Sequence, residues 1–254
     1  MIKEIDGVKI NYVCQGEGEL VLLLHGWGAN LTLWNDTINL LSQKYKVLAL
    51  DFAGFGESEE PPRSWNVDDY TNMTLEFLKD YDFDKITLFA HSFGGRVVIK
   101  MCSMDLPFKV EKTVLVDIAG VKPEKSAEQL KREKRYKQAK KILLSKPVKT
   151  IAPNALDKLQ SKTGSADYKS ASPVMRESLV KVVNEDLTHL MKNVDMPTLL
   201  IWGTNDDATP LSDGKLMETL MPEAALVEFA GAGHYSFLDA RNQYLRVVAS
   251  FMGI

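Results

Sequence analysis

Alternating and uninterrupted apolar stretches along the chain predict a sheet that begins antiparallel and continues parallel. Residues 2–5 alternate between apolar and polar, as do residues 8–12, and Asp6-Gly7 between them is a hairpin signal. Residues 20–24, Leu-Val-Leu-Leu-Leu, form a continuous apolar run. A run without alternation is typical of a strand covered on both faces, as in the middle of a parallel sheet.

Further strands and helices alternate after this opening. Strands are predicted over 46–50, 86–90, 113–116, 198–202 and 225–229, and helices around 31–41, 67–79, 97–102, 211–221 and 237–251. Such alternation favours a mostly parallel twisted sheet with helices on both faces. The predicted fold class is therefore α/β.

One segment, residues 120–192, interrupts the alternation. It is helical in composition, contains no convincing strand, and is much longer than a simple crossover between neighbouring parallel strands. We expect it to be an inserted helical cap. The core would then consist of residues 1–119 and 193–254.

This segment carries a dense basic run between residues 122 and 146, comprising Lys131, Arg132, Lys134, Arg135, Lys137, Lys140 and Lys141. A basic helix can bind nucleic acid or anionic lipid. Three glutamates interrupt this one, however, and Tyr136 is the single aromatic residue within it. A solvated face of the cap is the favoured interpretation, without nucleic acid as a partner.

The composition is that of a globular protein in water, with 254 residues of which 45% are hydrophobic and 26% charged. A net charge of −3 gives no reason to expect an anionic membrane as partner, and no apolar run approaches the roughly 18 residues of a membrane span. The first residues lack a signal-peptide pattern. Cys14 and Cys102 do not make a disulfide framework and are expected to be buried, reduced thiols. We therefore expect a cytoplasmic protein.

Candidate chemistry begins at the end of the strand over 86–90. Ser92 lies where that strand turns sharply into a helix, the geometry of a nucleophile elbow. The turn requires small residues two positions before and after the nucleophile, and Ala90 and Gly94 meet this need. The Phe93 amide would lie at the helix N-terminus, where it can donate to a developing oxyanion. A serine beside two glycines can also be a plain turn, so the rest of the chain must decide.

An acid and a histidine follow two later strands. Asp206 and Asp207 come after the strand over 198–202, and His234 comes after the strand over 225–229. Ligands bind at this carboxyl edge of a doubly wound sheet. Serine, acid and histidine thus occur in the chain order of one known catalytic triad. Asp117, which follows the strand over 113–116, is kept as a substitute acid.

These motifs together resemble those of α/β-hydrolase-fold serine hydrolases of the esterase-like kind, with a helical cap. The matching segments are His25-Gly26-Trp27-Gly28, residues 51–58, Ala90-His91-Ser92-Phe93-Gly94-Gly95, Trp202-Gly203 through Asp206 to Pro210, and Gly233-His234. Ala90 departs from the commonest family pattern, which has glycine there.

The resemblance implies that Ser92 is the nucleophile, Asp206 the acid and His234 the base. It also implies an oxyanion hole built from the amides of Trp27 and Phe93. Asp206 fits the family spacing, three residues after a glycine and four before a proline, so Asp207 is interpreted as a loop carboxylate. No metal or cofactor is needed for this chemistry.

The predicted activity is hydrolysis of a small carboxylic ester or related acyl compound through an acyl-enzyme. Relatives with such a triad also include C–C bond hydrolases, lactonases, thioesterases, perhydrolases and a lyase of menaquinone synthesis, which remain alternatives. Epoxide hydrolases and haloalkane dehalogenases are disfavoured because those relatives carry aspartate at the elbow. A small-ligand receptor that retains the triad is an alternative of another class. The partner expected is a small acyl substrate, and monomer and homodimer stay equally open.

Two further residues are predicted to have supporting roles. His25 is expected to hold the oxyanion loop by hydrogen bonds rather than to transfer protons. Asp51 is expected to tie down the glycine-rich loop that follows it.

Overall fold

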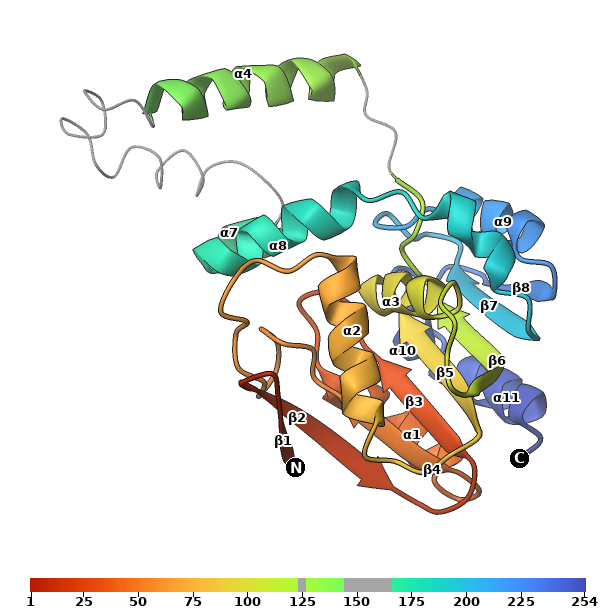
Figure 1. Ribbon diagram of the computed structural model, residues 1–254. Helices are drawn as coiled ribbons and strands as arrows, with labels where there is room; N and C mark the ends of the chain where they lie inside the picture. The colour runs from red at the N-terminus through yellow and green to blue at the C-terminus, as the bar shows by residue number, and fades with distance from the viewer. Residues whose placement is uncertain (123–126, 144–165) are drawn as a thin grey trace.

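A computed structural model of the chain describes residues 1–122, 127–143 and 166–254, and an eight-stranded sheet forms its centre (Figure 1). The strands lie in the order β1-β2-β4-β3-β5-β6-β7-β8. They are β1 (Ile2–Ile5), β2 (Val8–Gln15), β3 (Leu20–Leu24), β4 (Lys46–Leu50), β5 (Lys85–His91), β6 (Lys109–Val116), β7 (Thr198–Gly203) and β8 (Ala224–Phe229). The pairs β1–β2 and β2–β4 are antiparallel and every later pair is parallel, which confirms the predicted fold class.

The opening hairpin is the predicted one. Ile5 pairs with Val8, and the two residues between them, Asp6 and Gly7, have φ values of 50° and 80°. Two successive residues with positive φ are the requirement of a type I′ hairpin turn, which explains the Asp-Gly sequence.

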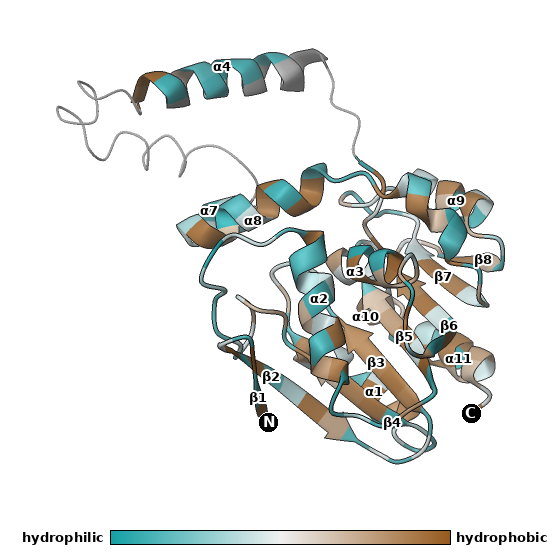
Figure 2. Cartoon of the chain, viewed as in Figure 1, coloured by the Kyte–Doolittle hydropathy of each residue, from teal (hydrophilic) through white to brown (hydrophobic). Residues whose placement is uncertain are grey.

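Helices cover both faces of the sheet. They are η1 (Leu31–Trp34), α1 (Asn35–Leu41), α2 (Val67–Leu78), α3 (Phe93–Met101), α9 (Leu211–Leu220), α10 (Ser236–Asp239) and α11 (Arg241–Met252). Leu22 and Leu24 of β3 pack in a cluster with α2, α3 and α9, whereas Val21 and Leu23 pack in a second cluster with α1, α10 and α11. The uninterrupted apolar run is therefore buried on both faces, and Figure 2 shows β3 as hydrophobic along its length.

The chain ends in two helices, so the prediction of one helix over 237–251 is wrong. Ala240, with φ of −112° and ψ of 40°, separates α10 from α11. Phe237 before the break and Tyr244 after it pack in the same core cluster. The apolar spacing consequently carries no sign of the interruption.

The described residues between β6 and β7 are helical where they have regular structure. They form α4 (Ala127–Leu143), α7 (Ala166–Ser170), α8 (Pro173–Asn184) and η2 (Thr188–Asn193), while residues 123–126 and 144–165 of the expected cap lie outside the described residues. The Leu187 amide donates to the Gly120 carbonyl at 2.9 Å, so the two ends of the segment meet at the sheet. Helix α4, which carries most of the basic run, is hydrophilic over most of its surface in Figure 2.

Cys14 and Cys102 are free thiols, and both are half-buried rather than fully buried as expected. Burial raises the pKa of the Cys102 thiol to about 12, which keeps that sulfur protonated and unreactive. Among the helices of the described ranges, none has the length and apolar character needed to cross a membrane.

Candidate active site

Ser92 occupies a strained turn between β5 and α3. Its φ of 48° and ψ of −113° place a non-glycine residue in a region that L-residues rarely adopt. The neighbouring chain over-determines this conformation: the Ser92 amide donates to the Val116 carbonyl at 3.2 Å, and the Ser92 carbonyl accepts from the Ala119 amide at 2.9 Å. The serine is thus fixed at the carboxyl edge of the central strands.

Two glycines make room for this turn. A Cβ on Gly94 would lie 2.5 Å from the Leu24 carbonyl oxygen, and a Cβ on Gly26 would lie 3.0 Å from the Ser92 Cβ. Helix α3 therefore approaches β3 too closely for any side chain at position 94. This contact is the physical reason for the glycine two residues after the serine.

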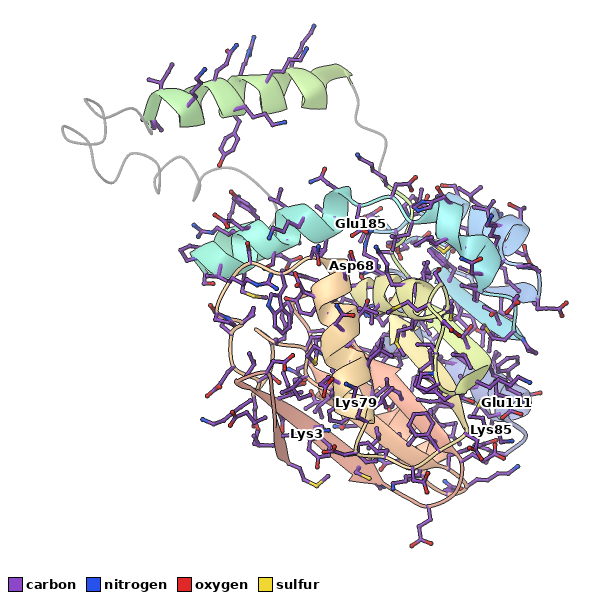
Figure 3. The ribbon with its side chains drawn as sticks, in the orientation of Figure 1. Lys3, Asp68, Lys79, Lys85, Glu111 and Glu185 are labelled. Carbon is purple, nitrogen blue, oxygen red and sulfur yellow. The ribbon has the colours of Figure 1, made fainter. Side chains whose placement is uncertain are left out.

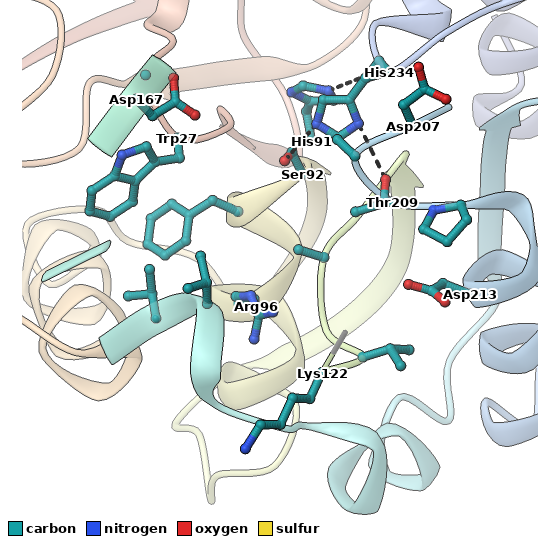
Figure 4. Close-up of a pocket in the computed structure, with 18 of the residues that line it drawn as sticks. Trp27, His91, Ser92, Arg96, Lys122, Asp167, Asp207, Thr209, Asp213 and His234 are labelled. Carbon is teal, nitrogen blue, oxygen red and sulfur yellow. Dashed lines mark hydrogen bonds between the residues drawn. The ribbon is translucent and has the colours of Figure 1, made fainter. Parts of the chain in front are cut away.

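Ser92, His234 and Asp206 form one chain of hydrogen bonds. The Ser92 Oγ lies 2.9 Å from His234 Nε2, and His234 Nδ1 lies 2.8 Å from Asp206 Oδ2. Because a carboxylate only accepts, Nδ1 carries the imidazole proton, and Nε2 is left to accept from the Ser92 hydroxyl. Figure 4 shows Ser92 and His234 side by side at the edge of the pocket.

Asp206 is buried among donors. Its Oδ1 accepts from the amides of Ala208 and Thr209 at 2.8 and 2.9 Å, and its Oδ2 accepts from the Thr209 hydroxyl at 2.7 Å as well as from His234. Burial opposes ionisation, but the hydrogen bonds from His234 and Thr209 outweigh it and hold the pKa of Asp206 below its ordinary value. The carboxylate is therefore ionised at neutral pH.

Asp117 is hydrogen-bonded to the loops that contain Asp206 and His234. Its Oδ1 accepts from the Gly203 amide at 2.8 Å and its Oδ2 from the Ser236 amide at 3.0 Å. The Asp117 carbonyl oxygen also lies 3.0 Å from the Thr209 hydroxyl, whose single proton is shared between this oxygen and Asp206 Oδ2. Burial raises the pKa of Asp117 to about 6. Its carboxylate faces backbone amides and, among the described residues, forms no hydrogen bond with an imidazole, so the structure gives it a supporting position.

Two further histidines are buried and neutral. Burial lowers the pKa of His25 to about 4, and its ring accepts from the Phe52 amide at 2.9 Å and donates to the Gly26 carbonyl at 2.7 Å. This matches the predicted loop-holding role. Burial lowers the pKa of His91 to about 3, and its Nε2 donates to the His234 carbonyl at 2.8 Å. His91 thus supports the backbone of the histidine that contacts Ser92.

Asp51 has the role predicted from its glycine-rich loop. One of its oxygens accepts from the Leu31 amide at 2.7 Å, and the other accepts from the Glu57 amide at 2.9 Å and from the Asn11 side chain at 2.8 Å. Its carboxylate therefore joins the loops after β3 and β4.

A cavity of about 790 Å³ opens above Ser92. Trp27, Phe93 and His234 line it together with residues of α8 and α9. Phe93 is the first residue of α3, and its ring lies 5.4 Å from the Trp27 ring. Within the described part of the chain, no protein acceptor is recorded for the amide of either residue. Both predicted oxyanion donors thus lie at the same cavity as the serine.

Sequence reasoning missed three members of this region. Thr209 bridges Asp206 and Asp117, His91 holds the His234 carbonyl, and Arg96 lines the cavity one helical turn after Ser92. Of these three, His91 carries a visible signal, since it is the last residue of β5. Thr209 and Arg96 carry none, because their roles depend on contacts between distant loops.

Comparison with known families agrees with this architecture. The family model described as "alpha/beta hydrolase fold" matches residues 19–241, which is most of the chain. The chain belongs to the α/β-hydrolase fold family. The resemblance inferred from the elbow, acid and histidine motifs is thereby confirmed at the level of the family.

Individual relatives of the chain are distant. It is 28% identical to an uncharacterised protein of Mycobacterium tuberculosis, over 98% of this chain and 80% of that protein. It is 24% identical to the pimeloyl-[acyl-carrier protein] methyl ester esterase of Aliivibrio fischeri, over 94% and 95% of the two chains. Among solved structures, the enol-lactonase of Burkholderia xenovorans LB400 superposes over the full length of both chains with a TM-score of 0.76 and 19% identity.

Proposed function

We propose that this α/β hydrolase is a serine hydrolase that cleaves a small carboxylic ester through an acyl-enzyme intermediate. The observation that carries the proposal is the unbroken hydrogen-bond chain from Ser92 through His234 to Asp206, with distances of 2.9 and 2.8 Å. A serine hydroxyl is a weak nucleophile at neutral pH and needs an adjacent base in this relation.

Acylation begins when Ser92 Oγ bonds to the ester carbonyl carbon while its proton passes to His234 Nε2. The carbonyl π electrons move to oxygen, and Asp206 stabilises the imidazolium that forms. When the tetrahedral intermediate collapses, the bond from carbon to the leaving oxygen breaks and His234 returns the proton to that oxygen. The products of this half-reaction are a free alcohol and an ester of Ser92.

Deacylation repeats these steps with water. The water oxygen bonds to the acyl carbon while His234 takes a proton from it, and the carbonyl π electrons move to oxygen. When this intermediate collapses, the bond from Ser92 Oγ to carbon breaks, His234 returns the proton to the serine, and the carboxylic acid leaves. In both halves the Trp27 and Phe93 amides would donate to the oxyanion. Loss of one such donor costs about 3–4 kcal/mol in a related acyl-transfer site, so these amides are a major part of the proposed rate enhancement.

The ester class is supported by the relatives. One is a methyl ester esterase and another is an enol-lactonase, and a lactone is a cyclic ester opened by the same nucleophilic attack. We therefore place carboxylic esters first and lactones and thioesters next.

Free thiols at Cys14 and Cys102 fit the proposed location in a reducing cytoplasm.

Residues 120–192 are proposed to act as the cap that selects the acyl group. Support comes from α8, where Leu179 and Val182 line the cavity that also contains Ser92. Leu179→Ala is expected to raise activity on bulkier acyl esters relative to acetate while the rate of covalent labelling at Ser92 stays the same. An unchanged acyl preference in the folded variant would remove the cap from substrate selection.

Covalent labelling tests the nucleophile directly. A fluorophosphonate or phenylmethanesulfonyl reagent is expected to modify the wild-type chain once, and mass spectrometry should locate the adduct on Ser92. Ser92→Ala should lose the label, whereas Ser103→Ala, after the end of the same helix, should label normally. An adduct on another residue contradicts the assignment.

A turnover screen then separates the remaining chemistries. Phenyl esters, thioesters, lactones and vinylogous diketones are compared on the wild-type chain, and esters are expected to turn over fastest. Fast cleavage of the diketones alone would favour a C–C hydrolase. Labelling without multiple turnover of any substrate, combined with ligand-dependent binding of a partner, would favour the receptor.

A further inference from the structure

A buried arginine lies in the candidate active site. Arg96 is on α3, four residues after Ser92, and only 3% of it is exposed. It lines the cavity that Ser92 and His234 also line. Figure 4 shows it below the serine, on the same side of the pocket as Lys122.

The guanidinium has little to compensate its charge. Its recorded hydrogen bond goes from Nη1 to the Glu185 carbonyl oxygen at 2.7 Å, and among the described residues no carboxylate forms an ion pair with it. The Glu185 carboxylate binds Lys100 at 2.6 Å instead, and Lys100 also binds Asp68 at 2.7 Å. Figure 3 places Glu185 and Asp68 near each other at the ends of α8 and α2.

The second nearby acid is also engaged elsewhere. Asp186 Oδ2 accepts from the Thr188 hydroxyl at 2.8 Å, and Oδ1 accepts from the Lys122 amide at 3.3 Å. The carboxylates of Asp186 and Glu185 thus act on Arg96 through their electrostatic field, without an ion pair among the described residues. Within the described part of the chain, the guanidinium therefore uses one of its five N–H donors, and the others are open to further acceptors.

A buried cation without an ion-pair partner among the described residues is costly. Burial lowers the pKa of Arg96 to about 10, against the opposing charges of Glu185 and Asp186, so the side chain is still charged at neutral pH. Buried charges in proteins are normally paired because desolvation without a partner is expensive. A charged fork that faces a cavity beside a nucleophile has the features of a binding group for an anion.

We propose that Arg96, assisted by Lys122, forms a carboxylate subsite, so that the preferred substrate is an ester whose acyl chain ends in a carboxylate. This inference rests on the proposed ester hydrolysis. Ser92 is the N-cap of α3 and Arg96 is the fourth residue of that helix, so an acyl chain with several carbon atoms between the ester carbonyl and the carboxylate is the first length to test. Lys122 is exposed and contributes charge at the rim.

A carboxylate is favoured over a phosphate by the rest of the cavity. Asp167, Asp207 and Asp213 line the same space. Repulsion from these acids is larger for a dianion than for a monoanion. The subsite is therefore assigned to a single carboxylate group.

The test compares substrates of equal shape and different charge. Monophenyl adipate carries a terminal carboxylate, phenyl 6-methylheptanoate is its neutral analogue, and phenyl 5-phosphonopentanoate carries a phosphonate. For Arg96→Met the ratio of kcat/KM for the adipate ester to that for the neutral ester is expected to fall about 10- to 100-fold, the range for hydrogen bonds to a charged group. Arg96→Lys should retain part of the ratio, and the phosphonate should be the poorer anion.

Controls separate recognition from structure. Lys122→Met should lower the ratio less than Arg96→Met does, and Arg63→Met, at an exposed arginine bound to Asp69, should leave it unchanged. If Arg96 only holds the Glu185 carbonyl, both esters will slow equally and the ratio will stay within threefold, which overturns the proposal. Faster cleavage of the phosphonate than of the adipate ester overturns the carboxylate assignment.

A binding measurement tests the subsite independently of ester turnover and of the folding of the Arg96 variants. Calorimetry with Ser92→Ala should give tighter binding of monophenyl adipate than of the neutral ester, and equal or weaker binding overturns the subsite. Absence of ester turnover in the wild-type chain would instead contradict the proposed function. The two failures are therefore distinguishable.

Discussion

Asp206→Asn is expected to leave the fold intact and to disable His234 as a base. The Asp206 Oδ1 accepts from two backbone amides, at 2.8 and 2.9 Å. An asparagine must keep its carbonyl oxygen there, because its NH₂ group would meet two donors. The NH₂ group is then directed at His234 Nδ1, which must accept and loses its proton. Nε2 takes up that proton and can no longer remove one from Ser92.

The magnitude follows from this forced tautomer. We expect kcat to fall by up to about 10⁴, as for the equivalent substitution in a serine-protease triad. That factor corresponds to about 5.4 kcal/mol of transition-state stabilisation. The assay is steady-state hydrolysis of a phenyl ester, with thermal melting to show that the variant is folded.

Asp207→Asn is the matched control. Asp207 is exposed at the rim of the same cavity and has no recorded bond to His234. Its substitution should cost about tenfold or less, since it perturbs only the loop. If Asp207→Asn were the more damaging change, the acid would have to be Asp207. Near-full activity in both variants would refute a triad that depends on Asp206.

Three further outcomes can be measured. Asp117→Asn replaces a carboxylate that accepts from two loop amides, so urea unfolding should show a loss of about 1–3 kcal/mol together with a lower kcat. Gly94→Ala would bring a Cβ to 2.5 Å from the Leu24 carbonyl oxygen, and thermal melting should show a loss of about 1–3 kcal/mol. The pKa of Asp206 lies below its ordinary value of 3.8 in the folded state. The ionised carboxylate therefore stabilises the fold fully at a pH above 3.8, and this stabilisation is lost as the pH falls through the folded-state pKa. Between pH 5 and 2, the free energy of unfolding should therefore fall less steeply with decreasing pH for Asp206→Asn than for the wild-type chain.

The central strands of the sheet were predictable because they are buried on both faces. An unbroken apolar run such as residues 20–24 has no other simple explanation between turn signals, and the strand over 46–50 was located to the residue. Helix interruptions were not predictable. Ala240 ends α10, yet the residues on each side of it keep burying the same stripe. Hydrophobic periodicity indicates which face of a helix is buried. It does not detect an interruption when the residues on both sides of it bury the same face.

The candidate site was predictable only where chemistry coincides with a strand end. Ser92, Asp206 and His234 each follow a strand, so the parallel sheet brings them to one edge, and their mutual hydrogen bonds lie within the reach that this edge allows. Arg96 lies inside an apolar helix pattern, and no local signal separates an arginine that faces a cavity from one that faces solvent. Its position depends on how α8 and η2 close over α3.

Three buried aspartates lie at this edge, and only one of them has an oxygen directed at an imidazole, as the proposed acid requires. Asp51 and Asp117 each accept a backbone amide at both carboxylate oxygens, so neither has an oxygen reserved for an imidazole. Asp206 receives both of its backbone amides at Oδ1, which leaves Oδ2 to the Thr209 hydroxyl and to His234. These three aspartates follow strands and are all buried and bound by amides, so burial and amide bonds alone do not identify the acid. The loop conformation decides which carboxylate oxygen is not bound by a backbone amide. Asp117 could replace Asp206 as the acid only if the two loops whose amides it accepts moved.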